Sequence, residues 1–266
     1  MPHLSRITIY PIKSLDGLEL TTAEALSSGA LRNDRRWALV DPEGNYVNGK
    51  RCPAIHQIRA SYREDCKEVT LSDSGHELTF SLSHEQQAIA EWCGRVIGQS
   101  CQMRENEVAG FPDDSESLGP TLISTATLKE VSSWFDNLSL KETRRRFRTN
   151  LEIDADQPFW EDQLVSQSNM NQRFRIGETL WQGQGVCQRC AVPTRDSQSG
   201  IVSPGFASQF SRQREELLPE WSPVKQSDHY YRLAINTSLD SIPGEAVLRV
   251  GDSVDMIEDT NFASNQ

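Results

Sequence analysis

Apolar residues in the first hundred positions alternate with polar ones, a period that is typical of β-strands. The stretch Ile7–Ser14 alternates until a proline interrupts it. Arg36–Val47 holds two apolar runs around Asp-Pro-Glu-Gly-Asn, and Val69–Leu82 holds two more around Ser-Asp-Ser-Gly. Because these linking residues favour tight turns, both segments predict β-hairpins.

Three segments carry the signals of helices instead. Ser83–Trp92 opens with the Ser-x-x-Gln spacing of a capping box. Thr127–Phe135 opens with Thr-x-x-Glu, and its apolar residues recur at helical spacing. Ser208–Leu218 stops before Pro219, a residue that cannot continue a helix. We therefore expect a few short helices among the strands.

The second half of the chain returns to strand patterns. Strands do not alternate regularly with helices along the sequence, so a doubly wound parallel sheet is not expected. The sequence predicts a mixed, β-rich (α+β) fold of two barrel-like units with a few helices. The strand segments in this half are Phe147–Ile153, Phe174–Trp181, Tyr230–Leu239 and Ala246–Met256.

The stretch from Arg104 to Pro120 separates the two halves. It is acidic, rich in glycine, proline and serine, and poor in apolar residues. This composition is typical of linkers and mobile loops. We therefore predict one domain at residues 1–105 and another at 121–258, joined by an acidic loop at 106–120.

Composition narrows the class of protein. The formal net charge of −11 repels nucleic acid and anionic membranes, so neither is expected as a partner. The sequence has no apolar run of about 18 residues, and its start lacks the apolar stretch of a signal peptide. We expect a cytoplasmic protein. The one dense basic cluster, Arg144–Arg148, is by itself typical of a solvated face.

The stretch GVCQRCAVPTRD holds a CxxC pair, Cys187 and Cys190. A structural zinc site needs four ligands, but the other four cysteines are scattered singly and the five histidines form no spaced pair. A redox CxxC opens a helix, whereas the residues that follow here are typical of a loop. Taken alone, the pair is most simply explained as two buried structural cysteines.

Six short motifs in a fixed order change this interpretation. They are YPIKSLDG, NDRRW, RFRTN, FRIGE, CQRCAVPTRD and LRVGD. Together they resemble the MOSC family, named after the C-terminal domain of molybdenum cofactor sulfurase. More narrowly, they resemble the branch with an N-terminal MOSC β-barrel, which includes the mitochondrial amidoxime reducing component and its bacterial relatives. The resemblance runs from about Leu4 to about Met256 and implies that 1–105 is the N-terminal barrel and 121–258 the MOSC domain.

The resemblance implies a molybdenum cofactor, a pterin whose metal also takes one protein thiolate. In the family's CxRC pattern the second cysteine is that ligand, which corresponds to Cys190. A soft thiolate suits the metal, and positive charge from Arg189 and Arg195 would favour the thiolate form. Cys187 matches the first cysteine, with a structural or neighbouring role.

Other motif residues correspond to contacts of the cofactor and the substrate. Phosphate requires fixed donors such as lysine, serine and arginine. Thr194 and Asp196 are expected on the substrate side, and Arg144–Arg146 on the surface. The implied cofactor contacts are Lys13, Ser14, Arg35, Arg148 and Asn150, with Ser117 or Thr121 at one further position.

The resemblance also implies an activity. The expected reaction is a two-electron reduction of N-hydroxylated or N-oxide compounds. The sequence lacks the four further cysteines of a ferredoxin domain, so a separate flavin or iron–sulfur reductase is expected to donate the electrons. The loops at 111–119 and 196–206 are expected to line the pocket. Two alternatives stay open: a carrier of the cofactor or of sulfur, with a persulfide on Cys190, and a cofactor-binding protein without turnover.

Overall fold

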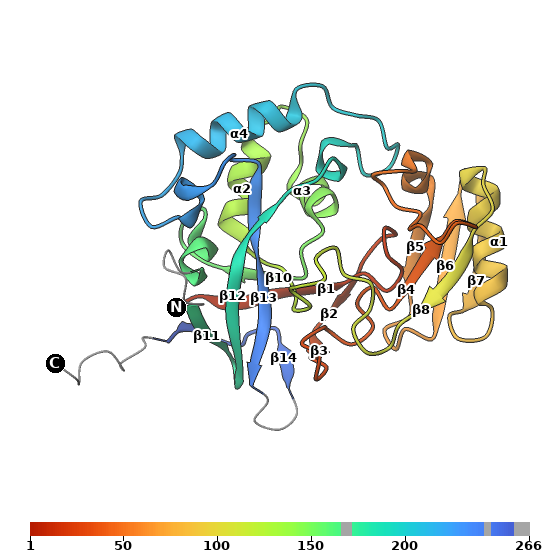
Figure 1. The fold of residues 1–266 in the computed structure, drawn as a ribbon, viewed down its shortest axis with the longest axis horizontal. Coiled ribbons are helices and arrows are strands. Elements are labelled where there is room, and N and C mark those ends of the chain that lie inside the picture. Colours follow the sequence, from red (N-terminus) through yellow and green to blue (C-terminus); the bar gives the residue numbers. More distant parts are fainter. Residues whose placement is uncertain (166–171, 242–245, 258–266) are drawn as a thin grey trace.

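The computed structural model describes residues 1–165, 172–241 and 246–257. Strands outnumber helices, and the fold is mixed and β-rich as predicted. Eight strands form one sheet in the order β15-β11-β12-β13-β9-β10-β1-β2 (Figure 1). Their bounds are β1 (His3–Ile9), β2 (Leu18–Leu20), β9 (Leu122–Ser124), β10 (Leu151–Asp154), β11 (Gln172–Ile176), β12 (Thr179–Gln188), β13 (Arg232–Ser241) and β15 (Val254–Met256).

The sheet draws on both halves of the sequence. β1 pairs with β10 in antiparallel register, with Ile7 opposite Leu151. A two-stranded sheet likewise joins β3 (Thr22–Glu24) to β14 (Val247–Arg249). The first strands of the chain thus share sheets with strands of the second half, and the domain limits at 105 and 121 stay a prediction.

A small lobe lies at the right of Figure 1. It is built around β4 and a buried cluster that includes Trp37, Ile58, Val69 and Trp92. The buried residues of its helix, Ile89, Ala90, Trp92 and Cys93, follow helical spacing. Its elements are β4 (Trp37–Val40), β5 (Arg59–Tyr62), β6 (Glu68–Asp73), β7 (His76–Ser81), β8 (Gln102–Glu105), α1 (Gln86–Ile97) and the 3₁₀ helix η1 (Pro53–Gln57).

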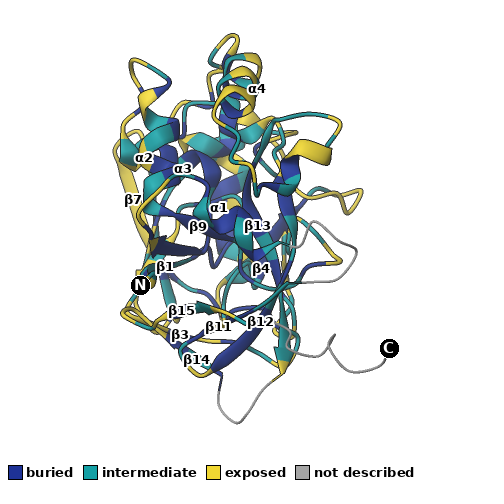
Figure 2. Ribbon diagram, turned by 90° about the vertical axis from the view of Figure 1, so that its left-hand side faces the viewer, coloured by how far each residue is buried: buried dark blue, intermediate teal, exposed yellow. Residues whose placement is uncertain are grey.

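Three helices cover one side of the large sheet, where Figure 2 shows their inner faces buried. α4 turns Phe206, Phe210 and Arg214 inward at intervals of four residues. Phe206 and Phe210 join an aromatic cluster with Trp134 and Phe147. The helices are α2 (Thr125–Ser133), α3 (Leu140–Phe147) and α4 (Phe206–Glu216), with 3₁₀ turns η2 (Trp160–Leu164), η3 (Val192–Thr194) and η4 (Pro223–Gln226).

The predicted hairpins and helices occur, with shifted details. β6 and β7 form the hairpin predicted over 69–82, whereas the second arm of the 36–47 hairpin shrinks to one bridge between Val40 and Tyr46. The predicted caps at Ser83 and Thr127 are wrong. α1 begins after Glu85, and α2 is capped by Ser124, whose hydroxyl accepts the Thr127 N–H. Because several polar residues precede each helix, the spacing alone does not select the cap.

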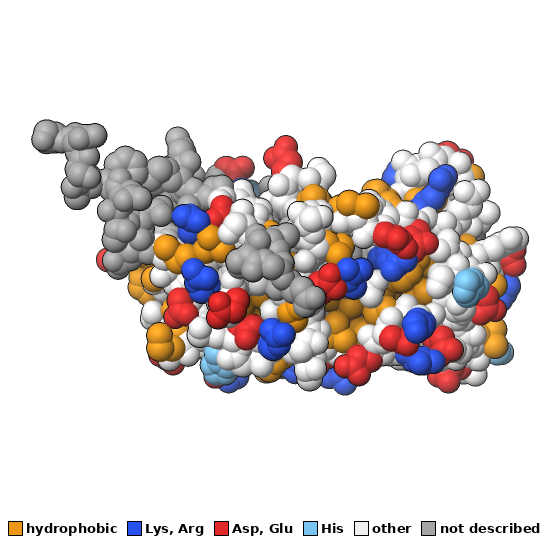
Figure 3. Space-filling model, turned by 90° about the horizontal axis from the view of Figure 1, so that it is seen from below, with side chains coloured by type: hydrophobic (Ala, Val, Ile, Leu, Met, Phe, Trp, Pro, Cys, Tyr) orange, Lys and Arg blue, Asp and Glu red, His pale blue; other side chains and the backbone are white. Residues whose placement is uncertain are grey.

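Charged side chains of both signs lie on the surface. On the face shown in Figure 3, acidic and basic side chains are interspersed between apolar ones. Within 1–165, 172–241 and 246–257, no helix is both long and apolar enough to cross a membrane.

Candidate functional site

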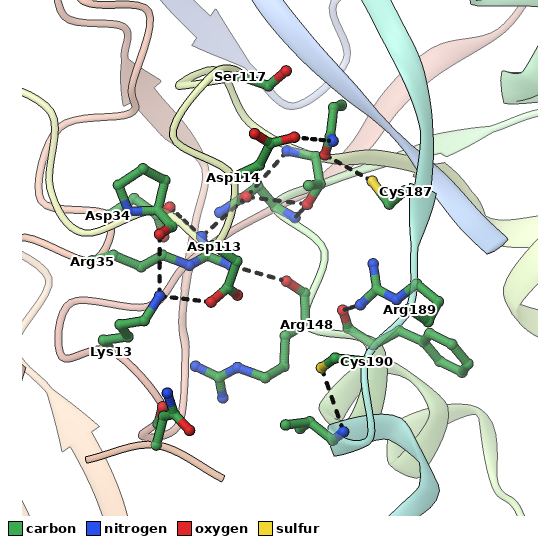
Figure 4. A pocket seen from close by; sticks show the side chains of 18 of the residues that line it. Lys13, Asp34, Arg35, Asp113, Asp114, Ser117, Arg148, Cys187, Arg189 and Cys190 are labelled. Carbon is green, nitrogen blue, oxygen red and sulfur yellow. Dashed lines mark hydrogen bonds and ion pairs between the residues drawn. The ribbon is translucent and has the colours of Figure 1, made fainter. Parts of the chain in front are cut away.

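A cavity of about 450 Å³ lies between the small lobe and the large sheet. Its walls come from the loop after β1, the loop at 112–119, the end of α3 and the end of β12. All seven residues predicted to contact the cofactor, from five separate segments, line it, and Figure 4 labels Lys13, Arg35, Ser117, Arg148 and Cys190 among them. They are Lys13, Ser14, Arg35, Ser117, Arg148, Asn150 and Cys190.

Three of these residues have left-handed backbone conformations. The φ angles are 74° for Ser14, 49° for Arg35 and 52° for Arg148. Such angles are uncommon outside glycine and cost on the order of 1–3 kcal/mol each. Strain of this kind gathers where a fold must present particular side chains, and here it gathers at the cavity wall.

Lys13, in the cavity wall, is hydrogen-bonded to the loop at 111–113. Its ammonium donates to Asp113 Oδ1 at 2.6 Å and to the carbonyl oxygen of Phe111 at 2.9 Å. Burial lowers the pKa of Lys13, and Asp113 opposes that shift. Despite the desolvation that opposes ionisation, Lys13 and Arg35 hold the pKa of Asp113 well below its usual range. Because the Asp113 side chain is 67% exposed, an anionic ligand can displace it toward water.

Asn150 positions Arg35 from the opposite wall. Its Oδ1 accepts from the Thr121 N–H at 3.2 Å and from Arg35 Nη1 at 3.4 Å, and its Nδ2 donates to the Thr8 carbonyl at 3.1 Å. Arg35 also pairs with Asp34. Asn150 therefore holds the strand and the arginine in place through contacts inside the protein.

Arg148 carries a positive charge without a carboxylate partner. Within the described part of the chain, its guanidinium makes no hydrogen bond or ion pair, and Nη2 is buried. Its charge lies 4.1 Å from the centre of the Tyr10 ring. Burial and the neighbouring Arg35 lower the pKa of Arg148, although Tyr10 opposes the shift. A buried cation in this state is costly unless an anion joins it, and Figure 4 shows the side chain extending between Lys13 and Cys190.

The two cysteines of the CxxC motif are not equivalent. Burial raises the pKa of the Cys187 thiol to about 11. Its Sγ donates to Asn236 Oδ1 at 2.8 Å, and Asn236 Nδ2 donates to Asp114 Oδ2 at 2.9 Å. Cys190 is partly exposed, and among the described residues its Sγ accepts only the Val192 N–H, at 3.5 Å. Cys190 is thus the thiol open to a ligand, while Cys187 is part of a buried hydrogen-bonded chain.

The two arginines beside Cys190 also differ. Arg189 lines the cavity, where its guanidinium donates to the Phe147 carbonyl at 2.6 Å. Its Nε has no partner among the described residues. Arg195 instead donates to the Gly200 carbonyl at 3.0 Å and is not part of the cavity lining. Arg189 is therefore the one of these two arginines that adds positive charge to the cavity lining.

The structure places the two expected substrate-side residues outside this cavity. Thr194 Oγ1 donates to the Ala191 carbonyl at 2.7 Å. The Asp196 carboxylate accepts the N–H groups of Gln198 and Ser199 and lies 3.8 Å from Arg146. Both residues shape the turn that follows Cys190.

The expectation that Arg144–Arg146 lie on the surface is wrong for Arg146. This residue is 8% exposed, lines the cavity and pairs with Glu142 at 2.7 Å. Arg144 is partly buried and pairs with Glu152 at 2.6 Å. The face of α3 that carries Arg146 packs against the turn after Cys190, because Glu142 also accepts from Ser197. Arg144 and Arg146 therefore lie on different sides of α3, and only Arg146 lines this cavity.

Two cavity features carried little or no signal in the sequence. His56, on η1, lines the cavity with Nε2 unpartnered among the described residues. Burial, Arg148 and Arg195 lower its pKa. A single histidine in a short turn has no motif that would mark it. The 112–119 loop was expected at the pocket from its position alone, without a specific role for Asp113.

The fold and the cavity define a β-rich protein with a cationic cleft beside one accessible thiol. The family model for the MOSC N-terminal beta barrel domain matches residues 1–140, and the model for the MOSC domain matches residues 121–255. The chain therefore belongs to the MOSC family, with the N-terminal barrel domain.

Curated relatives carry the name molybdenum cofactor sulfurase. The chain is 27% identical over 244 residues to the protein of Drosophila grimshawi and 28% identical over 243 residues to that of Drosophila yakuba. Each match covers 79% of this chain but 30% of the relative, so the chain spans less than a third of their length. Among solved structures, the YUAD protein of Bacillus subtilis aligns over 96% of both chains with 11% identity and a TM-score of 0.44.

Proposed function

We propose that the chain binds the molybdenum cofactor in the cavity between the small lobe and the large sheet. The observation that carries the proposal is the unpaired guanidinium of Arg148 in the same cavity as the accessible thiol of Cys190. An anionic ligand with a thiol-seeking metal would satisfy both at once. The names of the sulfurase relatives support the same ligand.

The donor set fits this group. Cys190 would bind the metal as a thiolate, which is the metal-binding form of a thiol. Lys13, Arg35 and Arg148 would hold the phosphate, and the cavity volume of about 450 Å³ lies in the range of cofactor sites. Outside residues 166–171, 242–245 and 258–266, no group of three or more His, Cys, Asp or Glu side chains could hold a metal ion.

We further propose that the protein is a reductase of N-hydroxylated or N-oxide compounds. The molybdenum centre, when bound, supplies exchange of two electrons and acceptance of an oxygen atom. For a hydroxylamine the balance is R–NHOH plus two electrons and two protons to R–NH₂ plus water. The electrons come from a separate flavin or iron–sulfur protein. The chain itself contributes an anion cradle, a metal ligand and an open cavity mouth for the substrate.

The first test measures molybdenum and pterin in protein produced in a host that makes the cofactor. We expect near-stoichiometric amounts of both, and a loss of at least tenfold in Cys190→Ala. The control is Cys101→Ala, which removes a thiol of the small lobe that is bonded to the Ala90 carbonyl. Wild-type protein that is folded but lacks both metal and pterin contradicts the proposal.

The second candidate function is a carrier of the cofactor or of sulfur, favoured by the names of the curated relatives. Reduction of a model hydroxylamine by loaded protein and an artificial electron donor separates the two functions. A reductase turns over many equivalents and loses turnover in Cys190→Ala. A carrier shows no turnover, and mass spectrometry detects a persulfide on Cys190.

A further inference from the structure

A second cavity, of about 520 Å³, lies against the first. Its walls come from β1 and the residues after it, from the β5 region, and from one side of α3 with the residues that follow. The two cavities share Ser14, His56, Arg148 and Asn150 in their linings. Arg148 thus belongs to both, and no motif of the sequence assigned a role to the second space.

The second cavity carries an excess of positive charge. Its lining includes six arginine and lysine side chains against three carboxylates. Each carboxylate is already paired: Glu19 with Arg6, Asp16 with Arg59 at 3.1 Å, and Glu152 with Arg144 at 2.6 Å. Three cations are left without a charged partner among the described residues, namely Lys141, Arg145 and Arg148.

The dipole of α3 does not explain this excess. Lys141 lies in its first turn, where the helix end is positive, and Arg148 follows its last residue. A helix C-terminus contributes only about half a negative charge, against three positive charges in excess at this wall. The protein as a whole is acidic, with a net charge of −11, so a concentration of unpaired cations here requires another partner.

Buried nitrogen atoms without hydrogen-bonding partners also indicate a ligand in this cavity. His56 Nε2, Arg59 Nε and Arg148 Nη2 all belong to residues that line the second cavity, although His56 and Arg148 line the first as well, and none has a hydrogen-bonding partner in the described structure. Buried nitrogen atoms in native proteins are nearly always satisfied by protein, water or ligand. Three such atoms around one cationic cavity indicate a bound group rich in acceptor oxygens.

We propose that the second cavity binds a small phosphate-bearing anion. Guanidinium groups match the paired oxygens of phosphate, and lysine adds a point charge. An anion in this space would also lie against Arg148, so it would partly neutralise the cation that faces the first cavity. Binding in the two cavities is therefore expected to be mutually weakening, by the same factor in each direction.

Calorimetric titration with inorganic pyrophosphate tests the proposal on the full chain as purified. The double variant Lys141→Ala/Arg145→Ala removes two cations that line only the second cavity. We expect its Kd for pyrophosphate to rise at least tenfold. The control Lys129→Ala/Arg212→Ala removes the same charge at exposed positions outside both linings and is expected to change the Kd less than twofold.

Lys13→Ala identifies the cavity that is occupied, because Lys13 lines only the first. Tight pyrophosphate binding that survives Lys13→Ala but not the Lys141/Arg145 change supports the second site. The reverse pattern, equal losses in the control, or no binding by folded wild-type protein overturns it. Molybdenum and pterin content of the Lys141/Arg145 variant stays normal in either case, so this test is independent of the proposed function.

Discussion

Arg148 combines two unfavourable features in one residue. Its φ of 52° is left-handed, and its guanidinium, whose Nη2 atom is buried, has no anionic partner within the described residues. Such a residue is retained when binding of a ligand offsets the backbone strain and the unpaired charge. At the residue scale, the site is thus poised for an anion rather than optimised for stability.

This balance predicts that Arg148→Gly stabilises the protein without cofactor. Glycine adopts the left-handed conformation without strain and removes the unpaired charge, although it loses the contact with the Tyr10 ring. We expect a gain of about 1 kcal/mol, or roughly 2–4 °C in Tm. Differential scanning fluorimetry measures it. Arg148→Ala removes the same charge but keeps the strain, so its gain is expected to be smaller; a lower Tm for the glycine variant than for the alanine variant contradicts the argument.

At the residue scale, the sequence indicated which residues lie together at the site better than it indicated the contacts that each residue makes. Motif resemblance predicted that Lys13, Arg35, Arg148 and Cys190 contact one cofactor, and the structure places all four in the lining of one cavity. It did not predict that the side chain of Asn150 makes its hydrogen bonds to other residues of the protein, Thr121 and Thr8. Hydrogen-bonding partners depend on segments that meet only in the folded chain, and no local pattern encodes them.

At the scale of elements, η2 holds a buried acid beside the start of α2. Glu161 is buried, and its Oε2 accepts from Thr127 Oγ1 at 2.9 Å. Burial, together with the neighbouring Asp162, raises the pKa of Glu161 to about 7. Ser124, which caps α2, also contacts Thr127 Oγ1, at 2.8 Å. The capping network of α2 thus includes a carboxyl that is held in its protonated form.

The protonated carboxyl predicts a stability that falls as pH rises. Between the ordinary pKa of about 4.5 and the folded value of about 7, the folded state binds more protons than the unfolded state, so each unit of pH in that window lowers the free energy of unfolding. The total is on the order of 3 kcal/mol. Glu161→Gln keeps the acceptor without the charge. Urea unfolding at pH 5 and pH 8 is expected to show a smaller loss in this variant, and equal losses in both proteins contradict the assignment.

The elements themselves were largely predictable, but their ends were not. Alternation and turn residues predicted the β6–β7 hairpin, since both signals are local. The 36–47 segment has the same signals, yet its second arm keeps only one bridge, while β4 pairs along its whole length with the distant β8. The choice of a distant pairing partner is a tertiary effect, which the periodicity of one segment does not contain.

At the scale of the whole molecule, the cavity exists only where the small lobe meets the sheet. Lys13 reaches the loop that leads from β8 to β9, and it bonds two backbone carbonyls there as well as Asp113. The loop closely approaches β13, because a Cβ on Gly119 would lie 2.3 Å from the Thr237 carbonyl oxygen. His56, on η1 of the small lobe, also lines the cavity. Assembly of these distant segments explains why the motifs were visible in the sequence and the geometry between them was not.

The Lys13–Asp113 pair at this junction predicts how firmly the proposed cofactor would be held. Asp113 is ionised and occupies the ammonium that a phosphate would use. Asp113→Asn removes one negative charge from the cavity while leaving the two carbonyl bonds of Lys13 in place. We expect cofactor loss during dialysis, followed by pterin fluorescence, to slow at least threefold. Glu116→Gln removes the same charge from an exposed residue of the same loop that also lines the cavity but makes no ion pair with Lys13, and it is expected to have a smaller effect. Faster cofactor loss from Asp113→Asn than from wild type would contradict this expectation. It would mean that the ion pair holds the loop in the conformation that binds the cofactor, and that this role outweighs the gain from the freed lysine.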